Sequence, residues 1–405
     1  MSKAALYLWL IILLIIIGAT ISYLPAYYHD MEPWQTKDAI AWGVMVPTYA
    51  YFALIATGAS TVNSLYTVFG YKGPKNVFEK IIKHAIWLSL ISLIPAWTPI
   101  LLDLGRLDHF TAMLTSFNYE SRIAWMGVLY VFFAIMVLIE LIHHILEDAH
   151  EPSKLEKAGA LGLTISLITL LADLLLDGNL GAVFGSSTAV PAWSGGYVSV
   201  LFVVMAIFMG AAWLTIYLPI LYASMGKEVN GLRELIAKTY GKVMMIVILA
   251  VGFIIGWEAI TSYDYPPRWE YFNEVFHGGF SGYFWWFVVG LGLVVPFFLA
   301  AWGYVKNNMG PTYVASIISA ISGYIFVYTF VIAGQIARIS FDYGGLTNNF
   351  NPYHVRFYPY HFTPSRVEVY LVAFSVALWA FLVTIGEMIL PLEKGEKPKH
   401  LWIFK

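Results

Sequence analysis

Long apolar segments, separated by shorter polar ones, follow one another along almost the whole chain. A membrane-spanning helix needs about 20 predominantly apolar residues, and ten segments come close to that length or exceed it. Their approximate bounds are 4–24, 40–68, 81–104, 122–147, 157–177, 195–223, 240–263, 282–305, 311–337 and 367–391. The pattern predicts an all-α integral membrane protein with about ten transmembrane helices.

The composition agrees with a multi-pass membrane protein. Of the 405 residues, 59% are hydrophobic and 12% are charged, whereas a soluble domain carries about 25% charged residues. The chain has no cysteine, so it cannot supply the thiolates of a disulfide or an iron–sulfur cluster. No basic patch and no phosphate-binding glycine loop indicates nucleic acid, and the partner that the composition implies is membrane lipid.

The basic residues predict how the chain crosses the cell membrane. With the N-terminus placed inside, sixteen of the 23 lysines and arginines lie on the inner side and seven on the outer side. The excess of positive charge on the cytoplasmic side therefore predicts that both termini are cytoplasmic. The last outer loop, residues 338–366, is long and rich in Tyr, Phe, Asn, Pro and His. We interpret it as a docking surface for an external subunit; an aromatic belt at the membrane interface is the alternative.

A weak internal repeat divides the chain. Trp42-Gly43 precedes Thr57-Gly58-Ala59 in the second apolar segment, and Trp193-Ser194-Gly195 precedes Met209-Gly210-Ala211 in the sixth at nearly the same spacing. Helices 2–5 and 6–9 would then be two four-helix bundles related as parallel repeats, flanked by helices 1 and 10. The predicted parts are 1–39 (first helix and outer loop), 40–180 (first bundle), 181–337 (second bundle) and 338–405 (long outer loop, last helix and tail).

Polar side chains gather near the outer ends of predicted helices 2, 3 and 4. At about 1.5 Å per residue, Thr48, Tyr49 and Tyr130 lie about 12 Å below the surface, while Asp103 and Arg106 close the third helix. Phenols, a carboxylate and a guanidinium around an apolar slot, with Trp125 as a wall, suit the head group of a quinone. A structural ion pair for Asp103 and Arg106, and an interfacial position for the tyrosines, are the alternatives.

Further acidic residues lie inside or at the ends of apolar segments. Glu140, Asp173 and Glu258 are candidates for a proton relay, because acids that face a bundle interior are costly to bury and serve proton transfer in membrane proteins. Interhelical hydrogen bonds without a role in proton transfer are the alternative. The histidines lie in loops, in tails or at inner helix ends such as His84, so no axial pair for a haem is expected, and no metal site either.

Several of these motifs together resemble the NrfD/PsrC family, the membrane subunits of polysulfide reductases and related complexes. The resemblance covers about residues 40 to 390, and ten helices correspond to its longer members. The motifs that carry it are Trp42-Gly43, Pro47-Thr48-Tyr49-Ala50-Tyr51-Phe52, Gly58-Ala59, Asp103-Leu104-Gly105-Arg106-Leu107-Asp108, Ser121-Arg122-Ile123-Ala124-Trp125-Met126-Gly127, Gly181-Ala182-Val183-Phe184-Gly185 and Pro191-Ala192-Trp193-Ser194. Leu107 and Arg122 stand where the family often has proline, and Tyr49 replaces its histidine.

The resemblance implies exchange of a membrane quinone, of menaquinone type or another, without bound redox cofactors. It also implies an extracytoplasmic four-cluster iron–sulfur subunit and a molybdenum catalytic subunit. We therefore expect a quinol-oxidising subunit of a respiratory complex, and family membership favours a sulfur or polysulfide reductase. A proton-coupled secondary transporter and a purely structural membrane anchor are the alternative functions.

Overall fold

The computed structural model describes residues 3–29, 40–103, 115–149, 155–344 and 362–395. Helices cover all ten predicted segments. They are α1 (Lys3–His29), α2 (Met45–Thr67), α3 (Phe78–Asp103), α5 (Arg122–Ala149), α6 (Leu155–Gly185), α7 (Tyr197–Met225), α9 (Gly241–Ser262), the consecutive η5 (Tyr283–Val294) and α11 (Val295–Lys306), α12 (Met309–Gly344) and α13 (Arg366–Ile389). Shorter helical pieces are η1 (Pro74–Asn76), α8 (Leu232–Glu234), η4 (Leu235–Tyr240) and α10 (Pro266–His277).

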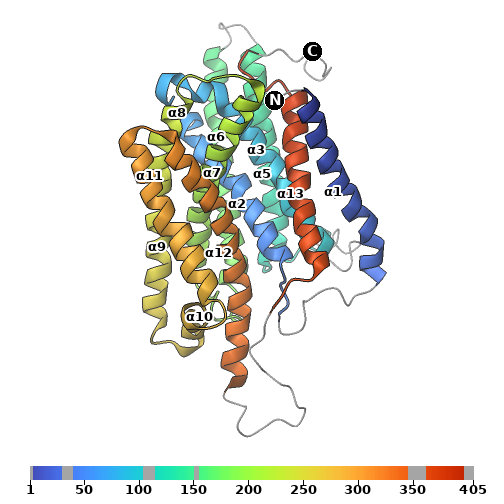
Figure 1. Ribbon diagram of the computed structural model, residues 1–405, viewed down its shortest axis with the longest axis vertical. Coiled ribbons are helices and arrows are strands. Elements are labelled where there is room, and N and C mark those ends of the chain that lie inside the picture. The colour runs from blue at the N-terminus through green and yellow to red at the C-terminus, as the bar shows by residue number, and fades with distance from the viewer. Residues whose placement is uncertain (1–2, 30–39, 104–114, 150–154, 345–361, 396–405) are drawn as a thin grey trace.

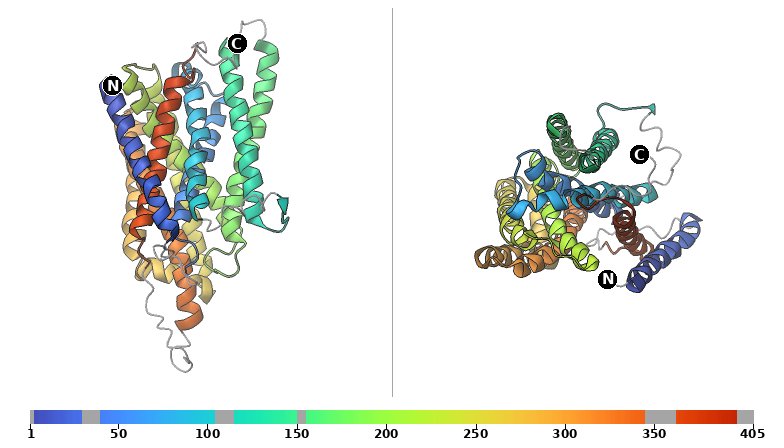
Figure 2. Two further views of the ribbon diagram at one scale, coloured as in Figure 1. Left: turned by 90° about the vertical axis from the view of Figure 1, so that its right-hand side faces the viewer. Right: turned by 90° about the horizontal axis from the view of Figure 1, so that it is seen from above.

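The long helices lie side by side and alternate in direction (Figures 1 and 2). The amphipathic α10 lies at one end of the assembly, which we call the outer end; α1 begins and α13 ends at the opposite, inner end. Among the described residues, eight helices are long and apolar enough to cross a membrane, and α1 adds the shorter apolar stretch Leu6–Ser22. The prediction of an all-α integral membrane protein with about ten helices is confirmed.

Helix α2 is more polar than the eight helices that are long and apolar enough to cross a membrane, and its position explains how it can cross the membrane. Most of its side chains are buried, including Thr48, Thr57, Ser60 and Asn63. It contacts α3, α6, α7, α12 and α13, so that protein rather than lipid surrounds it. A helix in this position can carry hydroxyl and amide groups because neighbouring helices offer them partners.

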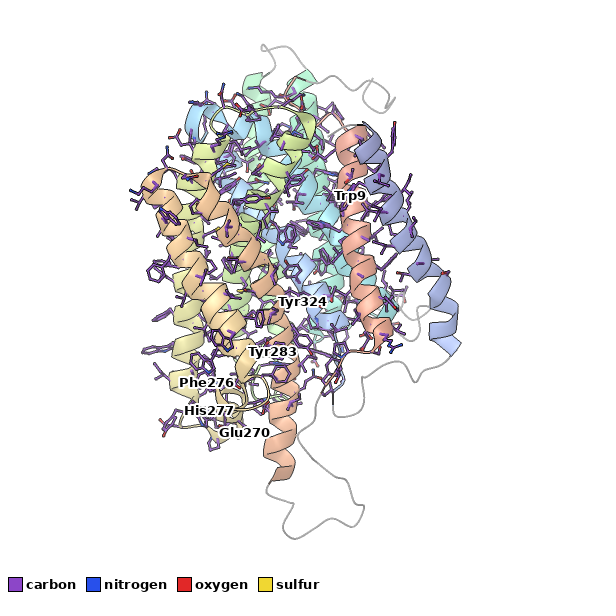
Figure 3. All side chains as sticks on the ribbon, viewed as in Figure 1. Trp9, Glu270, Phe276, His277, Tyr283 and Tyr324 are labelled. Carbon is purple, nitrogen blue, oxygen red and sulfur yellow. The ribbon has the colours of Figure 1, made fainter. Side chains whose placement is uncertain are left out.

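Eight of the long helices form two groups of four, and α2 lies where the two groups meet. Helices α2, α3, α5 and α6 contact one another in a ring, and α7, α9, α11 and α12 form a second ring. Contacts of α2 and α6 with α7, and of α2 with α12, join the two rings. Helix α13 packs against α3, and α1 lies outside it, where Trp9 (labelled in Figure 3) donates a hydrogen bond to Thr384 at 3.3 Å.

The two motifs of the predicted repeat meet each other at the junction of the rings. The indole rings of Trp42 and Trp193 stack, with centroids 5.0 Å apart. Farther in, a Cβ atom on Gly58 would overlap the backbone of Ala206 and Gly210, and one on Gly210 would overlap the backbone of Gly58. Equivalent residues contact one another in this way next to a two-fold axis; the repeat itself stays a prediction from the sequence.

We predict that Gly58→Ala lowers the free energy of unfolding by about 1–3 kcal/mol, because the added methyl group forces α2 and α7 apart. Gly256→Ala in α9 is the matched control, since a Cβ atom there meets nothing within 4 Å and alanine favours a helix over glycine. Thermal unfolding of the purified protein, followed by tryptophan fluorescence, measures both. Equal melting temperatures for the two variants would contradict the close contact.

Candidate functional site

An aromatic cluster lies near the outer ends of α2, α3 and α5. The rings of Tyr49 (α2) and Tyr130 (α5) have centroids 5.8 Å apart, and Trp97 (α3) meets the ring of Tyr130 edge-on, also at 5.8 Å. Tyr130 is only 2% exposed. Its hydroxyl has no well-formed hydrogen bond within the described part of the chain, although the phenol of Tyr49 lies beside it. The structure therefore brings the two predicted phenols together and adds Trp97.

Thr48 points to a different neighbour. Its hydroxyl lies 3.0 Å from that of Tyr324 on α12, which Figure 3 labels, and it donates to the carbonyl of Val44 at 2.8 Å. Consecutive residues of a helix point about 100° apart, so Tyr49 faces α5 while Thr48 faces the second ring. Thr48 thus stands beside the candidate site, and Tyr324 is its partner.

Trp125 makes its contacts at the surface of the outer end. Its indole N–H donates to the carbonyl of Tyr119 at 2.9 Å, and its ring meets Phe117 edge-on at 5.3 Å. These contacts hold the segment before α5 and do not include Tyr49 or Tyr130. The indole that lies against Tyr130 is that of Trp97 on α3, and not that of Trp125.

Asp103, the acid of the predicted Asp103–Arg106 pair, is the last residue of α3. Arg106 lies outside the described residues. Asp103 is partly exposed and within electrostatic reach of Glu368. Glu368 is buried in the first turn of α13, where its carboxylate accepts from the backbone N–H of Ser365 at 2.6 Å and the Ser365 hydroxyl accepts from the N–H of Glu368. The pairing of Asp103 with Arg106 stays a prediction.

A line of buried acids begins beside the aromatic cluster. Asp177 on α6 is in electrostatic contact with Tyr130, and its Oδ1 accepts a hydrogen bond from the hydroxyl of Thr57 at 2.7 Å. One turn farther in, Asp173 is completely buried. Neither of its carboxyl oxygens has a well-formed hydrogen bond to a described residue, although the hydroxyl groups of Ser60 and Thr61 lie nearby.

The line continues toward the inner end through Glu140 on α5. The hydroxyl of Ser166 donates to its Oε1 at 2.6 Å, and Thr169 and Thr67 lie close to the same carboxyl group. His144, one turn beyond Glu140, lies 3.5 Å from Glu147 at the inner end of α5. Two of the three predicted relay residues, Glu140 and Asp173, therefore share the interior of the first ring.

Three polar atoms in this interior have no well-formed hydrogen bond to a described residue: both oxygens of Asp173 and the hydroxyl of Thr61. A buried polar atom without a hydrogen bond costs about 1–3 kcal/mol, and such atoms are rare in folded proteins. Water molecules are the usual partners of such groups. The cluster fits a hydrated polar interior better than a packed apolar one.

Glu258, the third predicted relay residue, lies in the second ring and is separate from this line. Its Oε1 accepts from Arg268 Nη1 at 3.0 Å and from the hydroxyl of Ser262 at 3.2 Å, and Arg268 Nη2 donates to the carbonyl of Ser194 at 2.7 Å. This ion pair joins α9, α10 and the segment before α7. Its contacts are those of a structural interhelical pair, which was the alternative interpretation of this residue.

Sequence reasoning missed Trp97, Tyr324 and the hydroxyl partners of the acids. Trp97 and Tyr324 look like ordinary aromatic residues of apolar helices, and only the packing shows which of them meet Tyr130 and Thr48. The hydroxyl partners did leave a signal, because Thr57, Ser60, Thr61 and Ser64 form a polar stripe at helical spacing in α2. In the described ranges, no group of three or more His, Asp or Glu residues could hold a metal ion.

Fold and site together define a class: a multi-pass, all-helical membrane protein with an aromatic cluster and a line of buried acids inside its first ring. The family model described as "Polysulphide reductase, NrfD" matches residues 33–339. Because the match covers more than half of the chain, the protein belongs to this family, as its motifs indicated. Helix α13 lies beyond the matched residues.

Two curated relatives are similar to the chain over most of its length. The integral membrane subunit of an Hdr-like menaquinol oxidoreductase from Archaeoglobus fulgidus is 25% identical over 293 residues, which cover 72% of this chain and 70% of that protein. A selenate reductase subunit from Mesobacillus selenatarsenatis is 21% identical over 393 residues, which cover 89% of this chain and 88% of that protein.

We predict that Thr57→Val destabilises the protein by about 1–3 kcal/mol, because it leaves the buried Asp177 without its hydrogen-bond donor. Thr164→Val is the control: Thr164 is exposed and donates only to the carbonyl of Ala160 on its own helix. Melting temperatures of the two purified variants measure the difference. A loss of stability as large for Thr164→Val would show that the Thr57–Asp177 contact contributes nothing specific.

Proposed function

We propose that the protein is the quinone-binding membrane subunit of a respiratory oxidoreductase complex and that quinol is oxidised at the outer end of its first ring. Family membership supports the general role, and one relative is named for menaquinol oxidoreduction. The observation that carries the assignment to this place is the buried Tyr130 hydroxyl, which has no well-formed hydrogen bond within the described structure and lies between Tyr49 and Trp97.

The residues of the cluster suit a quinone head group. Each oxygen of a quinone or quinol needs a hydrogen-bond partner, and the phenols of Tyr130 and Tyr49 can donate to one oxygen or accept from it. Trp97 offers an aromatic wall. Small-molecule sites are usually lined by apolar and aromatic side chains with a few polar groups among them. Asp103 and Arg106 would complete the site from the outer surface.

A bound quinol supplies two electrons and two protons. The electrons need an acceptor outside this chain, because the sequence has no cysteine for an iron–sulfur cluster. We propose an extracytoplasmic four-cluster iron–sulfur subunit and a molybdenum catalytic subunit as partners. The loop 338–366 is the proposed docking surface, and the region beyond residue 344 up to 361 lies outside the described residues. Outward placement of the site requires the cytoplasmic termini predicted from the basic residues.

The protons have two places to go in this arrangement. Asp103 stands at the outer surface, where a carboxylate can accept a proton and pass it to water. Asp177, Asp173 and Glu140 lead from Tyr130 toward the inner end, with hydroxyl groups beside each acid. We propose that these acids serve as the relay, and that Glu258 does not because Arg268 holds it in an ion pair.

The terminal acceptor is proposed from the family description, which names polysulphide reductase. A sulfur or polysulfide reductase therefore remains the proposed complex, while the relative from Mesobacillus selenatarsenatis is named for selenate. A secondary transporter or an inert anchor could also contain buried acids. Neither of them needs a buried cluster of two phenols and an indole at one end of the bundle.

We predict that Tyr130→Phe weakens binding of a quinone analogue to the assembled complex by about tenfold, the equivalent of one lost hydrogen bond of about 1.4 kcal/mol, and lowers quinol-dependent turnover. Tyr240→Phe is the matched control. Tyr240 is also fully buried with an unpaired hydroxyl in the described structure, but it lies at the inner end of the second ring.

Titration of the purified complex with the analogue, followed by quenching of tryptophan fluorescence, gives both dissociation constants. Unchanged binding in Tyr130→Phe, or an equal loss in Tyr240→Phe, would remove the reason for placing quinol at this site.

A further inference from the structure

A second group of ionisable side chains lies at the inner end, away from the aromatic cluster and from the line of acids. His84 on α3 and Glu387 on α13 form a hydrogen bond of 2.8 Å between Nδ1 and Oε2. The hydroxyl of Tyr217 on α7 donates to the other carboxyl oxygen of Glu387. His84 is completely buried, and the side chain of Glu387 is 7% exposed.

His84 and Glu387 line a cavity of about 340 Å³. Its walls contain His84 and Glu387, the apolar side chains of Met225, Leu390 and Leu392, and the ion-paired Lys227 and Glu393. The cavity sits where the inner ends of α3, α7 and α13 meet, and it has room for several water molecules. An aqueous cavity thus adjoins a buried imidazole–carboxylate pair.

The hydrogen bonds fix which atom of the imidazole is free. When Glu387 is ionised, its Oε2 can only accept, so the Nδ1 of His84 carries the proton of this hydrogen bond. The other ring nitrogen, Nε2, is buried and has no partner in the described structure. In the neutral ring this nitrogen carries a lone pair, which makes it the atom that an incoming proton would reach.

The other charged and titratable side chains around the His84–Glu387 pair have interaction partners of their own. The ring of Tyr222 on α7 meets the ring of His84 edge-on at 5.5 Å, and its hydroxyl donates to the carbonyl of Lys80. Lys83 lies 2.8 Å from Asp148 on α5 and donates to the carbonyls of Pro391 and Glu393. Lys227 is held by Glu393. Lys83 and Lys227 therefore have partners of their own, and Glu387 is left to His84.

We propose that His84, Glu387 and Tyr217 form a proton-binding site that exchanges protons with the aqueous phase at the inner end. Nε2 of His84 is buried in the resting structure, so a small movement of the side chains around the ring must first open it to the cavity. A hydronium ion in the cavity then gives its proton to Nε2 and leaves as water. The imidazolium so formed is balanced by the carboxylate of Glu387, which Tyr217 holds in place. Release is the reverse step, so that atoms and charge balance without any other reactant.

A purely mechanical joint between three helices would not need these residue types. Burying a carboxylate and an imidazole costs free energy, and apolar residues of similar volume often hold a structure as well or better. Contacts that do not involve ionisable groups already join α3 and α13. The indole of Trp87 packs against Gly386, and the indole N–H of Trp379 donates to the hydroxyl of Ser92 at 2.9 Å. Ionisable groups at membrane depth indicate a function by default.

The same two helices also carry acids at their outer ends. His84 and Asp103 lie 19 residues apart on α3, and Glu368 and Glu387 lie 19 residues apart on α13. Because the two helices run antiparallel, one pair of ionisable residues stands at each end of their contact. Helix α13 lies beyond the residues that the family model matches. The inner site does not depend on quinol oxidation at the outer one.

The test is a pH titration of the purified complex by infrared difference spectroscopy, with histidine labelled by ¹³C in the ring. Histidine ordinarily changes charge between about pH 5 and pH 8, and the variant His84→Gln identifies which part of the signal belongs to His84. Glu387→Gln keeps the shape and one acceptor oxygen but removes the charge. Glu228→Gln, an exposed acid at the inner end paired with Arg233, is the matched control.

We expect a reversible imidazole signal that disappears in His84→Gln and stays unchanged in Glu228→Gln. In Glu387→Gln, proton binding should weaken by about tenfold or more, because the balancing charge is gone. The absence of any His84 signal between about pH 5 and pH 9, or an identical titration in Glu387→Gln, would show that the pair is only a structural joint. The melting temperature of each variant shows whether it is folded, and binding of the quinone analogue reports on the outer site separately.

Discussion

The close contact between α2 and α7 determines most of this structure. It needs glycine on both helices, at Gly58 and Gly210, because any side chain there would overlap the facing backbone. The contact places α2 in the centre, where α3, α6, α7 and α12 shield it from lipid. A helix shielded in this way can carry Thr57, Ser60, Thr61 and Asn63. The first three of these lie beside the buried acids of α6.

The interior of the first ring and that of the second therefore differ in chemistry although their helices are arranged alike. In the first ring, Asp177, Asp173 and Glu140 follow one another from the aromatic cluster toward the inner end, and part of their hydrogen-bonding capacity is unused within the described structure. In the second ring, Glu258 is neutralised by Arg268. If the two rings are repeats of one another, the first ring would have kept a polar interior, while the second ring would have taken on a structural role.

Much of the fold follows from the sequence. Ten apolar segments predicted ten helices. The two Trp–Gly motifs on which the predicted repeat rests meet at Trp42 and Trp193, while the repeat itself stays a prediction. The site was predicted only in part. Tyr49 and Tyr130 meet as expected, but depth along a helix does not give the direction of a side chain, so Thr48 faces Tyr324 and Trp125 faces Tyr119. The ion pair of Glu258 could not be foreseen, since its partner comes from a separate helix, α10.

The central claim, that quinol binds between Tyr49, Trp97 and Tyr130, is tested most directly by photoaffinity labelling of the intact complex with an azido-quinone, followed by mass spectrometry of the labelled peptides. The account predicts label on peptides of α2, α3 and α5 that contain these residues, and loss of that label when an unreactive quinone competes. Label that an unreactive quinone removes from the second ring around Glu258, or from the inner cavity beside His84, would contradict it.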